Sequence, residues 1–434
     1  MTHRAGAPRR LTTGALARVE GEGAMHVEIR DGSLVDVQLN IYEPPRFFEG
    51  FLRGRNYTEP ADITARICGI CPVAYQMSAC AAIEDAIGVT VDGPLRQLRR
   101  LLYCGEWIES HTLHIHFLHA PDFLGMHSAV EMAEANRAAV ERGLEIKQIG
   151  NQILETLGGR AIHPVNVKVG GFYRSPTRKE LGPLAERLER GRALALEVVD
   201  WVAGFEFPDQ DMPYEFVSVD HPEEYPVLGN AISSDRGLNI GVAEFPDHVA
   251  EFQVPHSTAL HARLLERGEY LVGPLARYSL HSSKLSPGAA AAARSAGLGR
   301  RCANPFRSIV VRAVEVVHAF ETALEIIDGY EQPDRPSVDI APRPGVGHGV
   351  SEAPRGLLYH RYELDEAGHI SDAVIVPPTS QNQPMIEGDL RRFVEANLHL
   401  ADDELQTRAE MTIRNHDPCI SCATHFLDLT VLRS

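Results

Sequence analysis

The chain has 434 residues, of which 44% are hydrophobic, and this is enough to fill a deep core. The 59 acidic residues outnumber the 42 basic ones, and the net charge of −17 argues against nucleic acid or an anionic membrane surface as a partner, because both need a basic face. No run approaches the roughly 20 apolar residues of a membrane span, and none follows the basic N-terminus, so we expect neither membrane insertion nor a signal peptide.

Helices dominate the first half of the chain. A β-hairpin is expected over residues 16–41, where apolar and polar residues alternate on both sides of an Asp31-Gly32 turn. A helix is expected over 73–87. Helical periodicity then extends over 95–158, in two or three long segments broken near 120–122, and over 178–203. These segments predict a central bundle of long helices.

The second half mixes strands and helices. In chain order, the expected elements are strands and loops over 212–255, an alanine-rich surface helix at 289–293, a helix over 304–328, a Pro/Gly-rich loop over 333–349, a hairpin over 357–376, a turn over 377–382 and a helical region over 389–414. The predicted fold class is α+β and mainly helical, with small sheets or hairpins around the central bundle. No repeat or linker divides the chain, so residues 1–434 are expected to form a single domain.

Two Cys-x-x-Cys pairs stand at opposite ends of the chain, Cys68 with Cys71 and Cys419 with Cys422. Each pair brings two thiolates to one metal, and thiolate selects zinc, iron–sulfur, nickel or copper. A structural zinc site usually takes both pairs from one module, with about 15 to 20 residues between them, whereas Cys419 follows Cys71 by 348 positions. The odd total of seven cysteines fits metal ligation in a reducing compartment, the cytoplasm by default.

The residues around these pairs resemble a known family. Residues 66–72 read Arg-x-Cys-Gly-x-Cys-Pro, and residues 417–425 read Asp-Pro-Cys-x-x-Cys-x-x-His. These are the two signatures of the large, catalytic subunit of nickel–iron hydrogenases, and landmarks between them match as well. The chain looks most similar to the soluble, bidirectional, NAD(P)-linked branch, some members of which also reduce sulfur.

The resemblance implies reversible cleavage of H2 into protons and electrons. The four cysteines would hold a Ni–Fe(CN)2(CO) centre, with all four sulfurs on nickel and with Cys71 and Cys422 also bridging to iron. The proton would pass to the Cys419 thiolate and then to Glu20. In most proteins a glutamate in such a turn is a solvated surface carboxylate, and Glu22 is a competitor two residues away.

The resemblance also assigns residues around the centre. Pro354 and Arg355 stand in an Ala-Pro-Arg-Gly motif and would line the cofactor site, with the guanidinium projecting over the metals towards one cyanide. Asp417 would pair with Arg355. Thr379 or Ser380 would donate a hydrogen bond to the other cyanide, and the sequence leaves open which of the two hydroxyls makes this contact.

Further residues have weaker assignments. Glu49 and His425 resemble a magnesium pair, although one carboxylate and one imidazole are a sparse set for an ion that prefers oxygen, and His425 alone is compatible with a zinc ligand or a helix cap. The histidines of residues 111–119 are expected in the core or near a small-subunit boundary, without a direct ligand role. The remaining cysteines are expected to be ordinary buried thiols: Cys80, Cys104 and Cys302.

Four cysteines committed to one centre leave no ligands for an electron relay, so the resemblance implies partner subunits. An iron–sulfur small subunit would take the electrons, and diaphorase subunits with flavin would pass them to NAD(P). Gly345, Gly347 and Gly349 form no dinucleotide fingerprint, because no βαβ unit surrounds them, so nicotinamide should bind another subunit. Maturation proteins and an endopeptidase are also implied, and residues 426–434 are the extension that the endopeptidase would remove.

Other functions stay open at this level. The electron partner could be coenzyme F420 or a membrane-bound H2-evolving complex. A quinone-binding homologue in the respiratory NADH:quinone oxidoreductase shares the fold but has lost the cysteines, so the intact pairs argue against it. Outside this family, the alternative is a scaffold protein stabilised by zinc at the four thiols.

Overall fold

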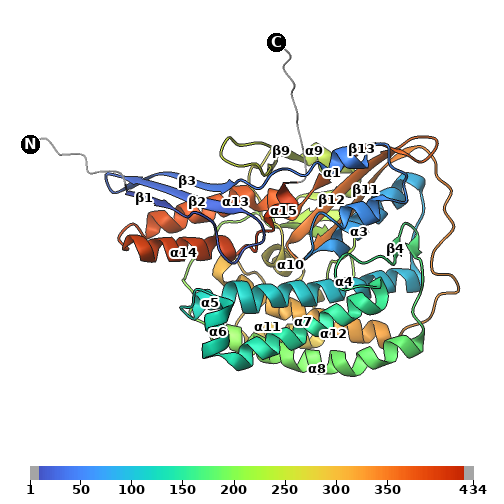
Figure 1. The fold of residues 1–434 in the computed structure, drawn as a ribbon, viewed down its shortest axis with the longest axis horizontal. Helices are drawn as coiled ribbons and strands as arrows, with labels where there is room; N and C mark the ends of the chain where they lie inside the picture. The colour runs from blue at the N-terminus through green and yellow to red at the C-terminus, as the bar shows by residue number, and fades with distance from the viewer. Residues whose placement is uncertain (1–8, 425–434) are drawn as a thin grey trace, which may run out of the picture.

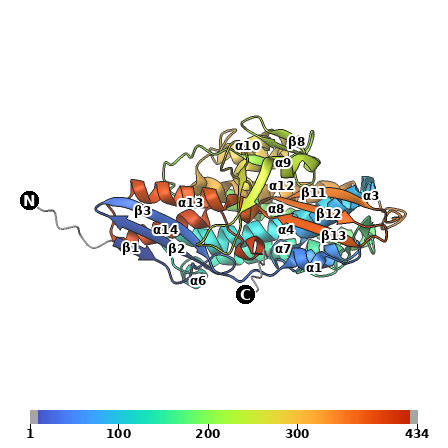
Figure 2. The same cartoon turned by 90° about the horizontal axis from the view of Figure 1, so that it is seen from above.

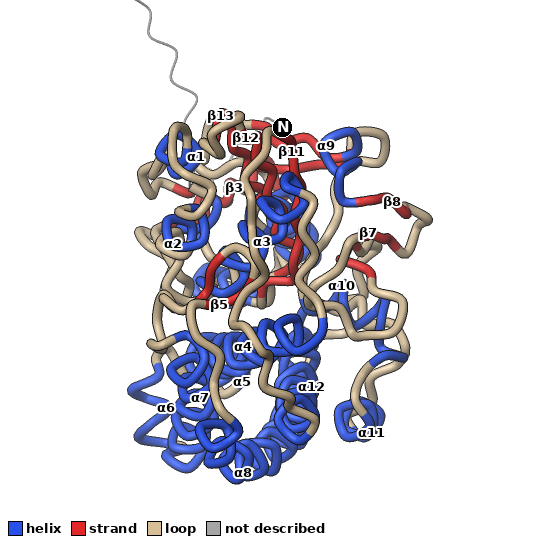
Figure 3. The backbone as a smooth tube through the Cα atoms, turned by 90° about the vertical axis from the view of Figure 1, so that its right-hand side faces the viewer, coloured by secondary structure: helices blue, strands red, loops and turns tan. Residues whose placement is uncertain are grey.

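Long helices form one layer of the protein. The computed structural model describes residues 9–424, and Figures 1 and 3 show these helices gathered on one side of the molecule, with most strands on the other. Four of them pack against one another: α4 (Gly93–Leu113), α7 (Arg137–Gly158), α8 (Arg178–Ala203) and α12 (Ser308–Asp328). The predicted central bundle is confirmed.

Local sequence sets where these helices begin. The side chains of Asp92 and Asn136 cap α4 and α7, and Thr177 and Glu180 form a capping box at the start of α8. The chain between α4 and α7 holds the expected break, as a π-helical segment and two short helices: η1 (His114–His119), α5 (Ala120–Phe123) and α6 (Ala129–Ala135).

The N-terminal sheet contains the predicted hairpin. Its strands are β2 (Gly23–Arg30) and β3 (Ser33–Ile41), and Asp31 and Gly32 between them have φ of 50° and 77°, as a tight two-residue turn requires. A third strand, β1 (Arg9–Thr12), pairs with β2 and was not predicted. The helices α13 (Pro378–Ala396) and α14 (Asp402–Arg414) share an apolar cluster with this sheet.

The structure corrects two predictions near the C-terminus. The helical region expected over 389–414 is mostly helical but contains the end of α13 and the whole of α14, which are separated at 397–401. The turn expected over 377–382 is mostly the opening of α13, because Pro378 occupies the first helical position. A proline fits there, since its φ is preset for a helix and the N–H that it lacks has no helical partner at that position.

A second antiparallel sheet consists of β11 (Gly345–Ala353), β12 (Gly356–Leu364) and β13 (Ile370–Val376). The hairpin of β12 and β13 was predicted, but β11 begins inside the expected loop over 333–349. Its glycines Gly345, Gly347 and Gly349 face α3 (Pro72–Ile87), and a Cβ added to Gly347 would lie 2.0 Å from the Ala82 carbonyl oxygen. These glycines therefore let a helix lie directly on a strand.

Shorter elements cover the remaining faces. They are α1 (Phe48–Leu52), α2 (Pro60–Thr64), β4 (Val167–Lys168), β5 (Gly171–Phe172), β6 (Val217–Asp220), β7 (Ala231–Ser234), β8 (Asn239–Gly241), α9 (Phe245–His248), β9 (Val249–Phe252), β10 (His261–Leu264), α10 (Pro274–His281), α11 (Pro287–Ser295) and α15 (Ile420–Ala423). The alanine helix α11 is not purely a surface element, because Ala289 and Ala293 are buried. Within residues 9–424, no helix is long and apolar enough to cross a membrane.

The last described helix, α15, lies where two apolar cores meet. In Figures 1 and 2 the β1–β3 sheet lies to the left and the β11–β13 sheet to the right. Cys419 and Cys422 belong to the main core of the molecule, whereas Ile420 and Ala423 belong to the core under the β1–β3 sheet. The C-terminal cysteine pair is therefore at the junction of the two cores.

Candidate metal centre

The four paired cysteines converge. Sγ–Sγ distances are 3.3 Å for Cys68–Cys419, 3.6 Å for Cys71–Cys422 and 2.9 Å for Cys419–Cys422, and all four sulfurs lie within 4.8 Å of one another. No two form a disulfide, which would need about 2.05 Å. The exposed fraction of each residue is at most 3%. Four buried thiols around one point are a ligand set for a thiophilic metal.

The start of α3 positions the first pair. Cys71 is the residue before the helix and Pro72 is its first residue. Two amides of this first turn, those of Val73 and Ala74, donate at 2.6 and 3.1 Å to the carboxylate of Glu106 on α4. Glu106 therefore binds N–H groups that no helical carbonyl could reach, and ties the first pair to the bundle.

Buried polar groups hold the segment before the second pair. His114 Nε2 donates to the carbonyl of Arg414 at 2.9 Å, and His119 Nε2 contacts Asn415 Oδ1 at the same distance. Ser308 Oγ and Arg312 donate to the Asn415 carbonyl at 2.7 and 3.1 Å. These contacts place the end of α14 before the chain turns sharply towards Cys419.

The turn itself is made at Asp417. This residue has φ of +52°, in the left-handed region that aspartate enters more readily than most residues. The neighbouring histidines remain uncharged, because burial lowers the pKa of His119 to about 3 and that of His114 well below its ordinary value. His114 and His119 are buried, as expected for core histidines, and their contacts hold the segment in place.

Arg355 and Asp417 form a buried ion pair beside the thiols. Arg355 Nη2 lies 2.9 Å from Asp417 Oδ1, and its Nε donates to the Asp417 carbonyl at 2.7 Å. Burial disfavours the guanidinium charge, but Asp417 and the cysteines outweigh this effect, so the pKa of Arg355 lies well above its ordinary value. A permanent positive charge is therefore fixed next to the four thiols.

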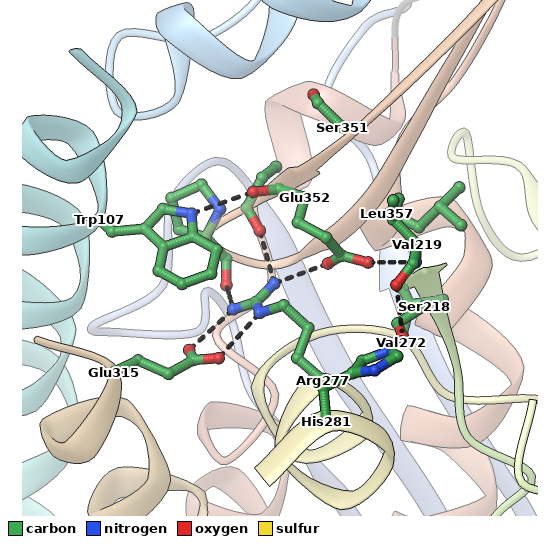
Figure 4. Close-up of polar contacts among 12 residues, drawn as sticks. Trp107, Ser218, Val219, Val272, Arg277, His281, Glu315, Ser351, Glu352 and Leu357 are labelled. Atoms are coloured by element: carbon green, nitrogen blue, oxygen red, sulfur yellow. Dashed lines mark hydrogen bonds and ion pairs between the residues drawn. The ribbon is translucent and has the colours of Figure 1, made fainter. Parts of the chain in front are cut away.

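A second buried arginine, Arg277, holds the backbone that carries Arg355. Figure 4 shows its guanidinium between Glu315 and Glu352, each 2.8 Å away. The same guanidinium donates to the carbonyls of Ala353 and Pro354 at 2.8 and 2.9 Å. All three charged side chains are fully buried. The network fixes the two residues before Arg355 and so sets where the guanidinium of Arg355 points.

Trp107 also belongs to this network, and Glu352 in it has a raised pKa. The Trp107 ring lies 4.5 Å from the Arg277 guanidinium, and its Nε1 donates to the Glu352 carbonyl at 3.0 Å. Burial raises the pKa of Glu352 to about 7, even though Arg277 acts in the opposite direction. Sequence reasoning missed Arg277. A usable signal was Glu315 inside the apolar run of α12, since a charge in a buried helix needs a partner.

Glu20 contacts the second pair directly. Its Oε2 accepts from Cys419 Sγ and from the Ser421 amide, both at 3.1 Å, and its carbonyl accepts from the Ile420 amide at 3.0 Å. Burial, and then the charge of Cys68, raises the pKa of Glu20, while the hydrogen bonds act in the opposite direction. The competitor Glu22 is exposed.

Arg46 links the two cysteine pairs and was also missed from the sequence. Its guanidinium donates to the carbonyl of Ile67, at 2.7 Å, and to that of Ser421. Its backbone amide donates to the Thr424 carbonyl at 2.8 Å. One side chain therefore bridges the residue before Cys68 and one of the two residues between the C-terminal cysteines.

The two candidate hydroxyls on α13 face different ways. Thr379 Oγ1 accepts from the Cys419 amide at 3.1 Å, so it lies beside the thiols. Ser380 Oγ donates to Glu251, and it also contacts the Pro377 carbonyl, each at 3.0 Å. Of the magnesium pair, Glu49 accepts from the Ile375 amide at 2.8 Å, whereas His425 lies outside the described residues.

The residues present fit a nickel–iron centre. The thiols supply soft ligands, the start of α3 directs the positive end of a long helix at Cys71, and Arg355 adds a positive charge. Hydrogen bonding from Cys419 lowers the pKa of the Cys68 thiol well below its ordinary value, and Arg355 acts in the same direction. The metal-binding thiolate form is thereby favoured at this position.

Comparison with known proteins places this geometry in a family. The sequence matches the family described as nickel-dependent hydrogenase over residues 46–142 and 274–425, more than half of the chain. Sulfhydrogenase 1 subunit alpha of Pyrococcus furiosus is 32% identical over 424 residues, which cover 96% of this chain and 98% of that protein. NAD-reducing hydrogenase HoxS subunit beta of Cupriavidus necator is 28% identical, with 96% and 95% covered.

Solved structures agree. An NAD+-reducing [NiFe]-hydrogenase in the H2-reduced state superposes with a TM-score of 0.87 at 26% identity, covering 97% of this chain and 100% of that one. The [NiFeSe]-hydrogenase of Dm. baculatum, at 22% identity, shares the fold with a TM-score of 0.79, covering 96% and 100%. The converging thiols and the match along nearly the whole length show that this chain belongs to the nickel-dependent hydrogenase family, as a large, catalytic subunit.

Proposed function

We propose that the chain cleaves H2 reversibly into protons and electrons at a nickel–iron centre and that the electrons pass on to NAD(P). The observation that carries the proposal is the set of charges around the four thiols. One thiol, Cys419, is hydrogen-bonded to the carboxylate of Glu20, and the Arg355 guanidinium lies beside the thiols. A metal site with a proton acceptor on one side and a fixed cation nearby suits heterolytic cleavage of an apolar substrate.

The Ni–Fe(CN)2(CO) centre would be held by Cys68, Cys71, Cys419 and Cys422, and its metals supply the Lewis acidity that makes H2 acidic. The protein handles the proton. The Cys419 thiolate accepts it first, and Glu20 Oε2, 3.1 Å away, takes it next. The raised pKa of Glu20 suits this role, because a relay works best when its pKa approaches the operating pH.

Four residues would orient the diatomic ligands. Arg355 would donate towards one cyanide, and Asp417 holds its guanidinium through two hydrogen bonds. Thr379 is favoured for the other cyanide over Ser380, because Thr379 accepts from Cys419 and keeps its own O–H to donate, whereas the Ser380 hydroxyl already donates to Glu251. Pro354 contributes the backbone that Arg277 holds, directly before Arg355.

The electrons would leave through partner subunits. Among residues 9–424 the only cluster of thiols is the one already committed to nickel and iron, so an iron–sulfur small subunit is required. Diaphorase subunits with flavin would carry electrons to NAD(P), by analogy with the NAD-reducing relatives. Magnesium at Glu49 and His425, a cytoplasmic location, maturation proteins and removal of residues 426–434 by an endopeptidase complete the proposal.

Metal analysis of the chain purified with its partners tests the centre. We expect about one nickel and one iron for the four thiols, with infrared bands of bound carbon monoxide and cyanide. Reduction of NAD(P) with H2 tests the electron partner, with F420 as the comparison. Zinc in place of nickel, without the infrared bands even after expression with maturation proteins, would contradict the proposal.

A further inference from the structure

A second group of potential metal ligands lies outside the cysteine site. Within residues 9–424, His256, His261 and Glu387 each offer one ligand atom, and these atoms lie within 4.8 Å of one another. His256 is in the loop between β9 and β10, His261 is the first residue of β10, and Glu387 is in the middle of α13. Two stretches of the chain, the loop that leads into β10 and the helix α13, therefore bring nitrogen and oxygen ligands close together.

The two imidazoles use different oxygens of one carboxylate. His256 Nε2 lies 2.7 Å from Glu387 Oε1, and His261 Nε2 lies 3.5 Å from Glu387 Oε2. The Leu39 amide on β3 donates to Oε1 at 2.8 Å and fixes the carboxylate. His256 and Glu387 are hydrogen-bonded, and the third ligand atom, on His261, lies within 4.8 Å of both, close enough for one small cation to contact all three residues.

His261 is the residue that an ion would satisfy. It is 2% exposed, and among the described residues neither of its ring nitrogens meets a hydrogen-bond partner of good geometry. Burying such nitrogens without partners costs free energy. A cation bound through Nε2 would remove part of that cost.

The charges nearby also favour a cation. Glu269 interacts electrostatically with Glu387. Burial raises the pKa of Glu269, the charge of Arg392 lowers it, and the negative charge of Glu387 raises it further. The site is also reachable, since the side chains of His256 and Glu387 are 21% and 19% exposed. An ion can enter from solvent while His261 stays buried.

We infer that His256, His261 and Glu387 bind a divalent zinc ion, with water in the fourth position. Two imidazoles and one carboxylate are a ligand set that zinc uses, whereas magnesium and calcium prefer sites made of oxygen alone. The ion would join the loop before β10 to α13, and Thr258 in this loop already bonds the Ile41 and Glu43 carbonyls. Glu387 stands eight residues after Thr379, about 12 Å along the helix axis.

The test uses the nickel- and iron-loaded complex, in which the four thiols are occupied. After chelator treatment, titration with Zn2+ should load one zinc per large subunit in the wild type. Glu387→Gln keeps an acceptor for Leu39 but loses the charge, and it should weaken zinc binding at least about 100-fold, as should His261→Asn. The matched control, Glu395→Gln, changes an exposed carboxylate of the same helix and should bind like the wild type.

Two measurements make the result independent of folding defects. Diffraction at the zinc edge should place the ion between the two histidines. Co2+ at this site should give weak visible bands without the strong thiolate charge transfer of a cysteine site. Zinc uptake that is equal in wild type and Glu387→Gln, or a zinc peak found at the cysteines alone, would overturn the inference and leave His256 and Glu387 as a plain hydrogen-bonded pair.

Discussion

Close backbone packing is the main support of the N-terminal cysteine pair, with Glu106 as an added polar tie, whereas several polar side chains hold the C-terminal pair. Cys68 and Cys71 precede α3, which lies on β11 against three glycines and is hydrogen-bonded to this strand through Ser78 and Ser351. Cys419 and Cys422 follow a segment that is bound by His114, His119 and other polar groups of the bundle.

The N-terminal pair is therefore held rigidly by packing, whereas the position of the C-terminal pair depends on individual hydrogen bonds. The close packing of α3 on β11 uses glycine, alanine and serine residues that do not titrate near neutral pH, and it leaves little room for change. Each polar contact to the second segment fixes a direction, and each can be removed or titrated singly. Proton transfer, which requires groups that titrate, is therefore expected on the side of Cys419. Substitutions near the two cysteine pairs should have different effects.

The largest effect on activity is expected for Glu20→Gln, which changes the carboxylate that is hydrogen-bonded to Cys419. The amide cannot relay a proton, so H2 oxidation and evolution should fall by about 100-fold to 10,000-fold, while nickel and iron contents stay at wild-type levels. Glu22→Gln, two residues away and exposed, should leave the rate unchanged. A parallel loss of metal in Glu20→Gln would show that the residue is structural.

A substitution of intermediate effect addresses the first pair. The Cβ of Gly347→Ala would lie 2.0 Å from the Ala82 carbonyl oxygen and 2.2 Å from the Ala86 amide, so strand and helix must separate. We expect a loss of about 3 kcal/mol in the free energy of unfolding, measured with denaturant. Gly14→Ala, where no atom lies within 4 Å, should change it by less than about 0.5 kcal/mol. Equal stability of the two variants would refute the packing argument.

The smallest effect concerns pH and the second pair. Burial lowers the pKa of His116 and of His119 to about 3 each, whereas a histidine in the unfolded chain has a pKa of about 6.5. Between these pH values the unfolded chain binds more protons than the folded protein does. Stability is therefore fully present above pH 6.5 and declines as the pH falls, by about 1.4 kcal/mol per pH unit for each histidine.

His119→Gln tests this pH dependence. Glutamine can still donate to Asn415 but does not titrate, so the unfolding midpoint should fall less between pH 7.5 and pH 5 than in the wild type, with a cost of about 1 kcal/mol at neutral pH. The exposed His399→Gln should retain the wild-type pH dependence. If His119→Gln behaved as His399→Gln does, buried neutral histidines would not be the cause.

Local sequence patterns predicted much of the fold. Both hairpins and the long helices depend on residues that are close together in the sequence, as do the two cysteine motifs, and the structure confirms the hairpins and helices. Failures came where a distant partner decides the outcome. β1 forms because it pairs with β2, and the role of the β11 glycines is clear only once α3 is known to pack against them. A Pro/Gly-rich composition alone indicated a loop.

The surroundings of the cysteines were less accessible to sequence reasoning. The motifs indicated Cys68, Cys419 and Arg355, but the partners of His114 and Arg312 lie about a hundred to three hundred positions away in the chain. No periodicity reports such pairings. Arg46 was missed for the same reason, since an arginine that donates to backbone carbonyls leaves no mark in the identity of its partners. Arg277 was missed although Glu315 gave a signal, because that signal does not say which distant arginine is the partner.

The burial of the four sulfurs has a consequence for how long a metal stays. With at most 3% of each cysteine exposed, a chelator cannot reach a bound ion in the closed fold. Exchange requires a local opening of the fold, and opening of the segment from 414 to 424 breaks the polar contacts described above, so the exchange rate depends on how often those contacts break as well as on how tightly sulfur holds nickel. The residence time of the metal is therefore set in part by His114, His119 and Arg312.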